Sequence, residues 1–295
     1  MIYEFMRKHS TEFDVKKMAQ VFEVSRAGYY KSIDRKESKT KRDNSALVVK
    51  IRDIHKKNRE TYGSPRVHRQ LKKDGIKCSR GRVARLMRSN KIRAKMGKKW
   101  KASDKRCKDL TRIAPNIVDQ EFNAPAPNMK WVSDITYIWT EEGWLYAAAV
   151  MDLFSRKIVG LGMGDKIDTS LIKRALEQAT CHRGPKPGLI LHSDRGSQYT
   201  SDEYKVITEL QGFRLSMSAK GYCYDNAAME SFFHTLKTEL TYFHKYQTRQ
   251  EAAASIFEYI EVFYNRQRMH STLDYQSPEE FEKQYEVQCK YLQIG

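Results

Sequence analysis

Three runs of apolar, aromatic and β-branched residues occupy positions 131–140, 144–151 and 156–163 of this 295-residue chain. Short polar segments separate the runs, first Glu-Glu-Gly and then Asp-Leu-Phe-Ser-Arg. Runs joined by such tight turns predict antiparallel strands, because a short connection brings the chain back alongside itself. The three strands commit this part of the chain to a sheet with a buried face.

The segments after these runs alternate between helix and strand patterns. Apolar residues at helical spacing predict a helix that ends at Gly184-Pro185. The full predicted order after the three strands is helix 169–181, strand 189–191, helix 201–211, strand 213–217 and a helix that bears Glu230. This order predicts an α/β fold with a mixed five-stranded sheet and helices packed on it.

Three acids lie on three of these elements. Asp134 lies in the first run, Asp194 follows a short buried strand, and Glu230 opens a helix. Magnesium prefers carboxylate oxygens, and two ions about 4 Å apart clamp both the attacking and the leaving oxygen of a phosphodiester. A single acid is more often a solvated surface group or a cap, and such a role is sufficient for Asp152 and Asp225. The joint pattern of the three acids favours a metal site.

Positive charge is concentrated in the first part of the chain. The net charge is +18, and residues 1–128 carry 35 Lys and Arg against 14 Asp and Glu, whereas residues 129–295 carry 19 against 22. An excess this uneven indicates a polyanionic partner for the first part, most simply DNA. The alternative, a basic surface that only aids solubility, suits a modest excess better. The near-neutral part fits a catalytic core whose acids are partly committed to metal.

Residues 1–40 have a helical pattern. Val15, Met18, Ala19 and Phe22 repeat at helical spacing, and Ser25 is placed to cap a following short helix. This unit fits either a helix-turn-helix or a plain three-helix packing unit.

Residues 41–99 form a second, basic helical unit. Ser64 is predicted to cap a helix that has Pro65 at its first position and stops at Asp74-Gly75, and Ser79 is predicted to cap another. Four arginines are predicted to face outward on that second helix: Arg80, Arg82, Arg85 and Arg88. A capped helix, a short turn and an arginine-rich helix form the layout by which helix-turn-helix proteins read the major groove. The alternative is a solvated basic face.

Proline-rich segments and helix-capping residues predict the domain organisation of the rest of the chain. Residues 100–128 are densely basic and then proline-rich, which predicts a linker before the core at 129–245. Residues 246–295 are predicted to form helices packed on the core, each opened by a capping box, Thr248 with Glu251 and Ser277 with Glu280. The loop 218–225 is either a flap over the site or an ordinary connector.

Several protein classes are excluded by composition. No apolar run approaches the roughly 20 residues of a membrane helix, and the first residues lack the apolar centre of a signal peptide. Five scattered cysteines without a C-x-x-C pair predict reduced thiols in a cytoplasmic protein, and the histidines do not complete a zinc site.

Several sequence motifs, taken together, resemble one known family. They are W-V-S-D-I-T-Y at 131–137, H-S-D-R-G-S-Q-Y at 192–199, N-A-A-M-E-S-F-F-H-T-L-K at 226–237, Y-G-S-P-R-V at 62–67 and Y-N-R-Q-R-M-H-S-T-L at 264–273. Their order and spacing are similar to those of the OrfB-type D-D-E transposases of the insertion-sequence three family, which are related to retroviral integrases. The resemblance covers nearly the whole chain.

The resemblance implies an RNase H-like catalytic core in which Asp134, Asp194 and Glu230 are catalytic and hold two Mg²⁺ ions, with Mn²⁺ as a substitute. It implies metal-dependent nicking at the 3′ ends of an insertion sequence, followed by strand transfer. It also makes Lys237 a contact to the DNA end. The full set expected to contact DNA is Lys237, His234, Arg66, Arg80, Arg82, Arg85, Arg88 and Arg268.

The partners implied are double-stranded DNA, as terminal inverted repeats and as target, and further copies of this chain on that DNA. In this family the active enzyme is usually an OrfA–OrfB fusion whose upstream part supplies a leucine zipper. No sustained heptad run occurs before residue 44, so an OrfA partner is expected. Binding to DNA partners of this kind implies a location in the cytoplasm, in association with the nucleoid. The rival functions are an RNase H-fold nuclease without strand joining and a catalytically idle, repressor-like DNA-binding protein.

Overall fold

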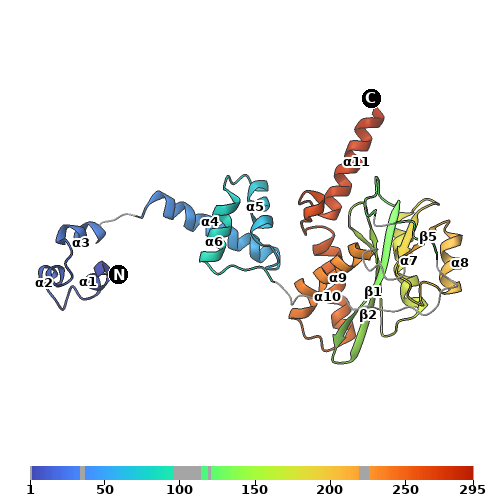
Figure 1. Cartoon of the computed structure of the whole chain (residues 1–295), viewed down its shortest axis with the longest axis horizontal. Coiled ribbons are helices and arrows are strands. Elements are labelled where there is room, and N and C mark those ends of the chain that lie inside the picture. The colour runs from blue at the N-terminus through green and yellow to red at the C-terminus, as the bar shows by residue number, and fades with distance from the viewer. Residues whose placement is uncertain (1, 34–36, 96–113, 119–120, 219–225, 295) are drawn as a thin grey trace.

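The computed structural model describes residues 2–33, 37–95, 114–118, 121–218 and 226–294. Two small helical units precede an α/β core, and a long helix ends the described chain (Figure 1). Most of the predicted linker at 100–128 lies outside the described residues, as do Asp225 and nearly all of the loop at 218–225.

The core is a mixed five-stranded sheet. Its strands are β1 (Lys130–Thr140), β2 (Gly143–Asp152), β3 (Ile158–Gly164), β4 (Ile190–Ser193) and β5 (Arg214–Met217). Their order across the sheet is β3-β2-β1-β4-β5, with β1 to β3 antiparallel and β4 and β5 parallel to β1. The predicted strands and the five-stranded mixed sheet are confirmed.

Helices cover both faces of this sheet. Successive β2 residues point to opposite sides, so Ala148 packs in a cluster with α7 (Thr169–Arg183) and α8 (Asp202–Leu210). Ala147 packs on the other face with α9 (Ala227–Glu239) and α10 (Arg249–Glu258). The strands are thus buried on both faces, which explains their near-continuous apolar sequence.

Helix α7 lies unusually close to β3. A Cβ atom added at Gly160 would stand 2.0 Å from the Ala175 carbonyl oxygen, and one at Gly162 would stand 2.3 Å from the Leu171 carbonyl oxygen. No real Cβ fits at such distances, so glycine at these two positions permits direct backbone contact between helix and strand. Gly184, left-handed at φ 50°, ends α7 as predicted.

The C-terminal segment returns to the α9 face of the sheet. After α9 come η2 (Thr241–Phe243), α10, the π-helix η3 (Tyr259–Tyr264), η4 (Ser271–Leu273) and α11 (Pro278–Ile294). Buried Glu282 of α11 accepts hydrogen bonds from Arg183 at 2.8 and 2.9 Å and from Ser155 at 2.8 Å. This network ties α11 to the core.

The two predicted capping boxes differ in detail. Ser277 and Glu280 form a reciprocal pair, in which the Glu280 amide donates to the Ser277 hydroxyl and the Ser277 amide donates to the Glu280 carboxylate. At α10 the Thr248 hydroxyl accepts from the Glu251 amide, but the Glu251 carboxylate reaches the amide of Gln247 instead.

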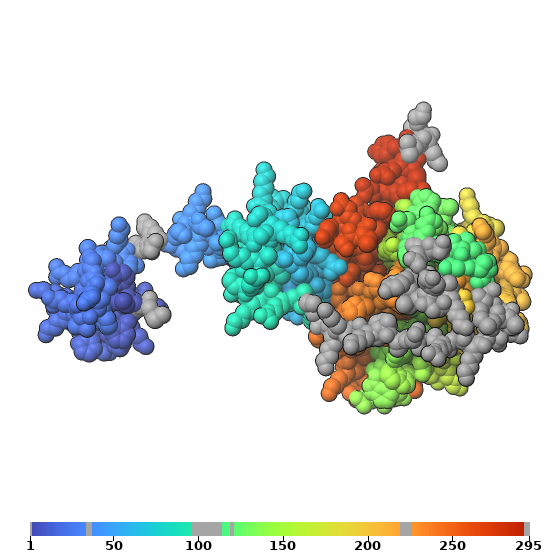
Figure 2. Space-filling view, viewed as in Figure 1, coloured from blue at the N-terminus to red at the C-terminus, as the bar shows by residue number. Residues whose placement is uncertain are grey.

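The second helical unit comprises α4 (Lys39–Lys57), α5 (Ser64–Lys73) and α6 (Arg80–Ser89). The prediction that Ser64 caps α5 was wrong, because the cap is Gly63 and Ser64 already lies in the helix. Ser79 caps α6 as predicted, with its hydroxyl accepting from the Arg82 amide. This unit adjoins the C-terminal segment (Figure 2).

The first helical unit stands apart from the rest of the molecule (Figure 1). Helices α1 (Ile2–Lys8), α2 (Val15–Val21) and α3 (Arg26–Ile33) enclose a small core of four residues, Met6, Met18, Ala19 and Tyr29. The Ser25 hydroxyl accepts from the Gly28 amide at the start of α3. None of the described helices is both long and apolar enough to cross a bilayer.

Candidate active site

The sheet brings Asp134 and Asp194 side by side. β1 and β4 are parallel neighbours, and their last paired residues are Ser133 and Ser193. In both cases the next residue along the sequence is an aspartate. Asp134 lies within β1 and Asp194 directly follows β4, so the parallel register brings together two acids that are 60 positions apart in sequence.

Backbone amides orient both carboxylates. The Oδ1 atom of Asp134 accepts from the Ile135 amide at 2.8 Å, and that of Asp194 accepts from the Gly196 amide at 2.9 Å. Both side chains are partly exposed. Carboxylate oxygens are the ligands that hard divalent cations prefer.

Tyr199 lies close enough to both acids to be affected by their charges. Its buried hydroxyl lies 2.9 Å from the Ser133 hydroxyl. Burial, and then the nearby charges of Asp134 and Asp194 with Tyr204 beside them, raise the pKa of the Tyr199 phenol well above its usual value. The two carboxylates therefore act on the same buried group. The sequence prediction gave Tyr199 no role, although it lies five positions after Asp194 in the H-S-D-R-G-S-Q-Y motif.

A second set of contacts fixes the end of β4. His192 is fully buried, with Nδ1 at 2.9 Å from the Ser216 hydroxyl and Nε2 at 3.2 Å from the Ser218 hydroxyl. The Nε atom of Arg195 donates to the Ser218 carbonyl at 2.6 Å. These bonds hold the strand ends together on both sides of Asp194.

Glu230 lies in the first turn of α9, as predicted. Met229, Phe232, Phe233 and Leu236 of that helix are buried against the sheet, which fixes the helix beside β1. Burial raises the pKa of the Glu230 carboxyl above its usual value.

The donor set fits a hard divalent cation, because Asp134, Asp194 and Glu230 offer only carboxylate oxygens. Among the residues that the structure describes, no group of three or more His, Cys, Asp and Glu side chains stands ready to hold a metal ion. The two aspartates are brought together by the sheet, whereas the Glu230 carboxylate does not complete a closed ligand set with them.

Comparison with known proteins agrees with this architecture. Residues 41–100 match the family described as HTH-like domain, and residues 124–223 and 230–285 match two families described as integrase core domain. The chain is 38% identical over 289 residues to "Transposase InsF for insertion sequence IS3A" of Escherichia coli (strain K12), covering 96% of this chain and 98% of that protein.

Two further relatives are similar over nearly their whole length. "Transposase for insertion sequence element IS904" of Lactococcus lactis is 43% identical over 249 residues, which is 84% of this chain and 98% of that protein. "Insertion element IS600 uncharacterized 31 kDa protein" of Shigella sonnei is 44% identical over 268 residues, which is 91% of this chain and 98% of that protein. The chain belongs to the IS3 family of transposases. Its predicted RNase H-like, integrase-type fold and its class, a D-D-E polynucleotidyl transferase, are thereby confirmed.

In this transposase the residues predicted to contact DNA differ in how far their side chains are exposed. Lys237 is partly exposed and places its ammonium 4.6 Å from the centroid of the Tyr137 ring, and His234 is exposed on the same helix. On α6 three arginines are exposed, namely Arg80, Arg85 and Arg88. Arg82 does not face outward as predicted, because it is partly buried and its Nε atom donates to Asn44 of α4 at 2.9 Å.

Arg66 and Arg268 are not surface groups of this transposase. Arg268 is buried and donates from Nε and Nη2 to both carboxylate oxygens of Glu239, at 2.8 and 2.7 Å. Arg66 is mostly buried, and its Nη1 atom lies 3.9 Å from the same carboxylate. The prediction that these two arginines face DNA needs correction, because both are enclosed where the second helical unit meets the C-terminal segment.

Proposed function

We propose that this transposase nicks DNA at the 3′ ends of its own insertion sequence and joins each freed 3′ hydroxyl to target DNA. The observation that supports this most is that the parallel register of β1 and β4 brings Asp134 and Asp194 together, with the charges of both acting on the buried Tyr199. A basic helix-turn-helix-like unit on the same chain supplies the means to hold the DNA.

Nicking hydrolyses one phosphodiester bond, and joining exchanges one phosphodiester bond for another. In nicking, a water oxygen attacks phosphorus, the bond from phosphorus to the 3′ oxygen breaks, and a 3′ hydroxyl is released. In joining, that hydroxyl attacks a target phosphorus, and a target 3′ oxygen leaves as the new bond forms. One bond replaces another in the second step, so no nucleoside triphosphate is required.

Asp134, Asp194 and Glu230 would hold two Mg²⁺ ions, or Mn²⁺ in their place. When bound, such ions supply activation of the attacking oxygen and stabilisation of the leaving oxygen. The chain itself supplies the orientation of the ligands, since Tyr199 and Ser133 support β1 under Asp134, and His192 supports β4 under Asp194. Glu230 would move into the ligand set as DNA and metal bind.

Lys237 would contact a phosphate near the DNA end. Its ammonium is held over the Tyr137 ring at 4.6 Å, seven positions after Glu230 on the same helix. Arg80, Arg85 and Arg88 would contact the terminal inverted repeat from α6, on the exposed side of the second helical unit. These assignments place repeat recognition and chemistry on separate parts of the chain.

Further copies of this chain are proposed to assemble on the paired ends of the element, since two ends must be joined to one target. An OrfA partner or fusion is proposed to contribute to that assembly. A location on the nucleoid would follow from binding to chromosomal DNA.

The test is a cleavage and joining assay on duplexes that carry the flanks of the chain's own gene, in Mg²⁺ and in EDTA. Asp134→Asn, Asp194→Asn and Glu230→Gln should each abolish nicking and joining while DNA binding persists, because they remove metal charge and no packed volume. Substantial nicking by Asp194→Asn would overturn the assignment. Nicking without joining would indicate a nuclease, and binding without either step a repressor-like protein.

A further inference from the structure

A buried polar cluster connects the second helical unit to the helix that bears Glu230. Its centre is Glu239, the last residue of α9. The Glu239 carboxylate accepts from Arg268 at 2.7 and 2.8 Å and from the Tyr259 hydroxyl at 2.8 Å. Arg268 and Glu239 expose only 6% and 8% of their side chains, so this pair is shielded from water.

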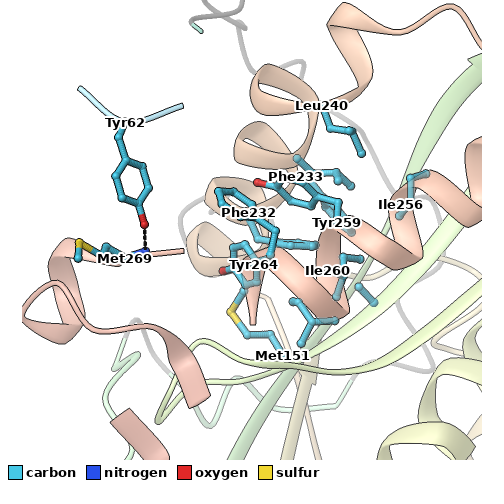
Figure 3. Packing of buried hydrophobic residues seen from close by; sticks show 14 of the residues in the cluster. Tyr62, Met151, Phe232, Phe233, Leu240, Ile256, Tyr259, Ile260, Tyr264 and Met269 are labelled. Atoms are coloured by element: carbon cyan, nitrogen blue, oxygen red, sulfur yellow. Dashed lines mark hydrogen bonds between the residues drawn. The ribbon is translucent and has the colours of Figure 1, made fainter. Parts of the chain in front are cut away.

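The second helical unit reaches the same place through Tyr62 and Arg66. The fully buried Tyr62 hydroxyl accepts from the Met269 amide at 2.8 Å and donates to the Gln267 carbonyl at 3.2 Å (Figure 3). It thereby clamps the backbone on both sides of Arg268. Arg66 lies 3.9 Å from the Glu239 carboxylate and 5.6 Å from the centroid of the Tyr62 ring.

Exposed ion pairs surround this centre. The Arg59 side chain pairs with Glu258 and lies 4.9 Å from the centroid of the Phe263 ring. Lys73 pairs with Glu280 at 2.7 Å. Exposed pairs contribute little free energy, so the geometry of the contact is set by the buried groups.

The choice of charged residues at this centre indicates a positional role. A buried ion pair is often no more stabilising than apolar residues of the same volume, because desolvation offsets the attraction. The two parallel hydrogen bonds of a guanidinium to a carboxylate are directional, and they fix the relative orientation of the segments that carry them. An apolar contact would bind these parts without specifying their register.

Glu230 lies on the same rigid helix as Glu239, nine positions earlier, which is about two and a half helical turns. Tyr62, Arg268 and Glu239 thus form a continuous series of contacts from the second helical unit to the helix that carries Glu230. The sheet fixes the two aspartates independently of this path.

We propose that Tyr62, Glu239 and Arg268 form a joint that sets the distance between the DNA held by α4–α6 and the Glu230 carboxylate. They are positioning residues, and the joint determines which phosphate is nicked. The inference rests on the proposed function, since it assigns the joint a part in end nicking. Arg66 completes the joint from the side of the second helical unit.

The experiment maps the nicked phosphate on end-labelled duplexes carrying the flanks of the gene, with the full-length chain. The unaltered chain should cut at one phosphate. Tyr62→Phe and Arg268→Lys should bind this DNA equally well but cut at several neighbouring phosphates, since each keeps the packed volume and removes the directional bonds. A single unshifted nick in both variants would overturn the proposal.

Two matched controls distinguish a change in the position of the nick from a general loss of folding stability. Tyr246→Phe removes the hydroxyl by which a buried tyrosine bonds to Ser255, and Arg183→Lys disrupts a partly buried guanidinium pair with Glu282, both away from the joint. These variants should lose stability and keep the single nick. Scattered nicks in the controls as well would also count against the joint, because general loosening would then explain the effect.

Hydrogen exchange provides a readout that does not need nicking. In Tyr62→Phe, exchange should accelerate together in residues 62–67, in residues 264–270 and in the last turn of α9. Unchanged exchange at the end of α9 would overturn the joint. If the unaltered chain binds DNA without nicking it, the proposed function fails, and this exchange result decides the joint separately.

Discussion

Aspartates of this chain have opposite roles according to their surroundings. Asp152 is fully buried, with its two oxygens accepting from the amides of Asn128 and Phe154 and one of them also from Arg183. Asp134 and Asp194 are partly exposed at the place where β1 passes the end of β4. The buried acid is satisfied by the protein, whereas the two exposed acids retain access to a ligand.

Asp152→Asn is expected to destabilise the fold by about 1–3 kcal/mol, because the substitution removes a buried acceptor for the amides and for Arg183. Nicking per folded molecule should be unchanged. Denaturant unfolding combined with the nicking assay measures both quantities. Asp194→Asn is the matched variant and should show the reverse pattern; loss of nicking by folded Asp152→Asn would mean that the wrong carboxylates were assigned to the metal.

His270 predicts a dependence of stability on pH. Burial, and then the neighbouring charges of Arg268, Arg66 and Arg156, lower the pKa of His270 well below 6.5. Below about pH 6.5 the unfolded chain takes up a proton that the folded chain does not, so this contribution to stability declines as the pH falls, by about 1.4 kcal/mol per pH unit.

The measurement is denaturant unfolding of the unaltered chain and of His270→Gln between pH 7.5 and pH 5.5. The variant is expected to be less stable at neutral pH and to show a flatter decline on acidification. Equal slopes for the two chains would show that His270 does not remain neutral in the fold.

At this scale the sequence identified Asp134, Asp194 and Glu230 as a set, and the structure places the first two together. Arg66 and Arg268 were predicted to face DNA, because an isolated arginine in a basic chain is usually exposed. Their burial depends on Glu239, which is distant from both in sequence. No local pattern contains that information.

Among the elements, the strands of the core were predictable because turn residues separate them. The long helix α4 was not predicted as a separate element, although Leu47, Val48, Ile51 and Ile54 lie at helical spacing and are all buried. The near contact of β3 and α7 was not predictable, because it depends on which helix face meets Gly160.

Gly160→Ala should destabilise the core strongly, since the added Cβ would meet the Ala175 carbonyl oxygen at 2.0 Å and the rigid backbones cannot separate cheaply. Overpacking of this kind costs typically about 1–3 kcal/mol or more. Gly81→Ala in α6 is the control, because nothing lies within 4 Å of its Cβ. Thermal unfolding should show that the control is stabilised by about 0.5–1 kcal/mol.

On α6, Arg85→Ala with Arg88→Ala should weaken DNA binding and reduce the slope of log affinity against log salt by about 0.9 for each phosphate that an arginine no longer neutralises. Gel shifts over a range of salt concentrations measure both quantities. Arg82→Ala is the matched control; it breaks the bond to Asn44 and should lower stability with little change in slope. An unchanged slope in the double variant would identify α6 as a solvated face.

In the whole molecule, charge and chemistry are divided along the chain. The basic residues lie mainly in 1–128, whereas Asp134, Asp194 and Glu230 belong to the near-neutral remainder. The charge split was visible in the sequence, but the contact between the two parts was not, because it is made by the pairing of Tyr62 with residues 267–269. The two parts therefore meet at a contact whose centre is buried and around which exposed ion pairs lie.

The order of these parts along the chain also sets an order in time during synthesis. The helices α4–α6 pack on one another and leave the ribosome before α9, which needs residues up to Tyr264 to bury its apolar face. At about 5–20 residues per second, roughly 10–30 s separate the two events. A nascent chain would thus hold nearby DNA before it is able to cut, which favours action on the copy of the element from which it is being translated.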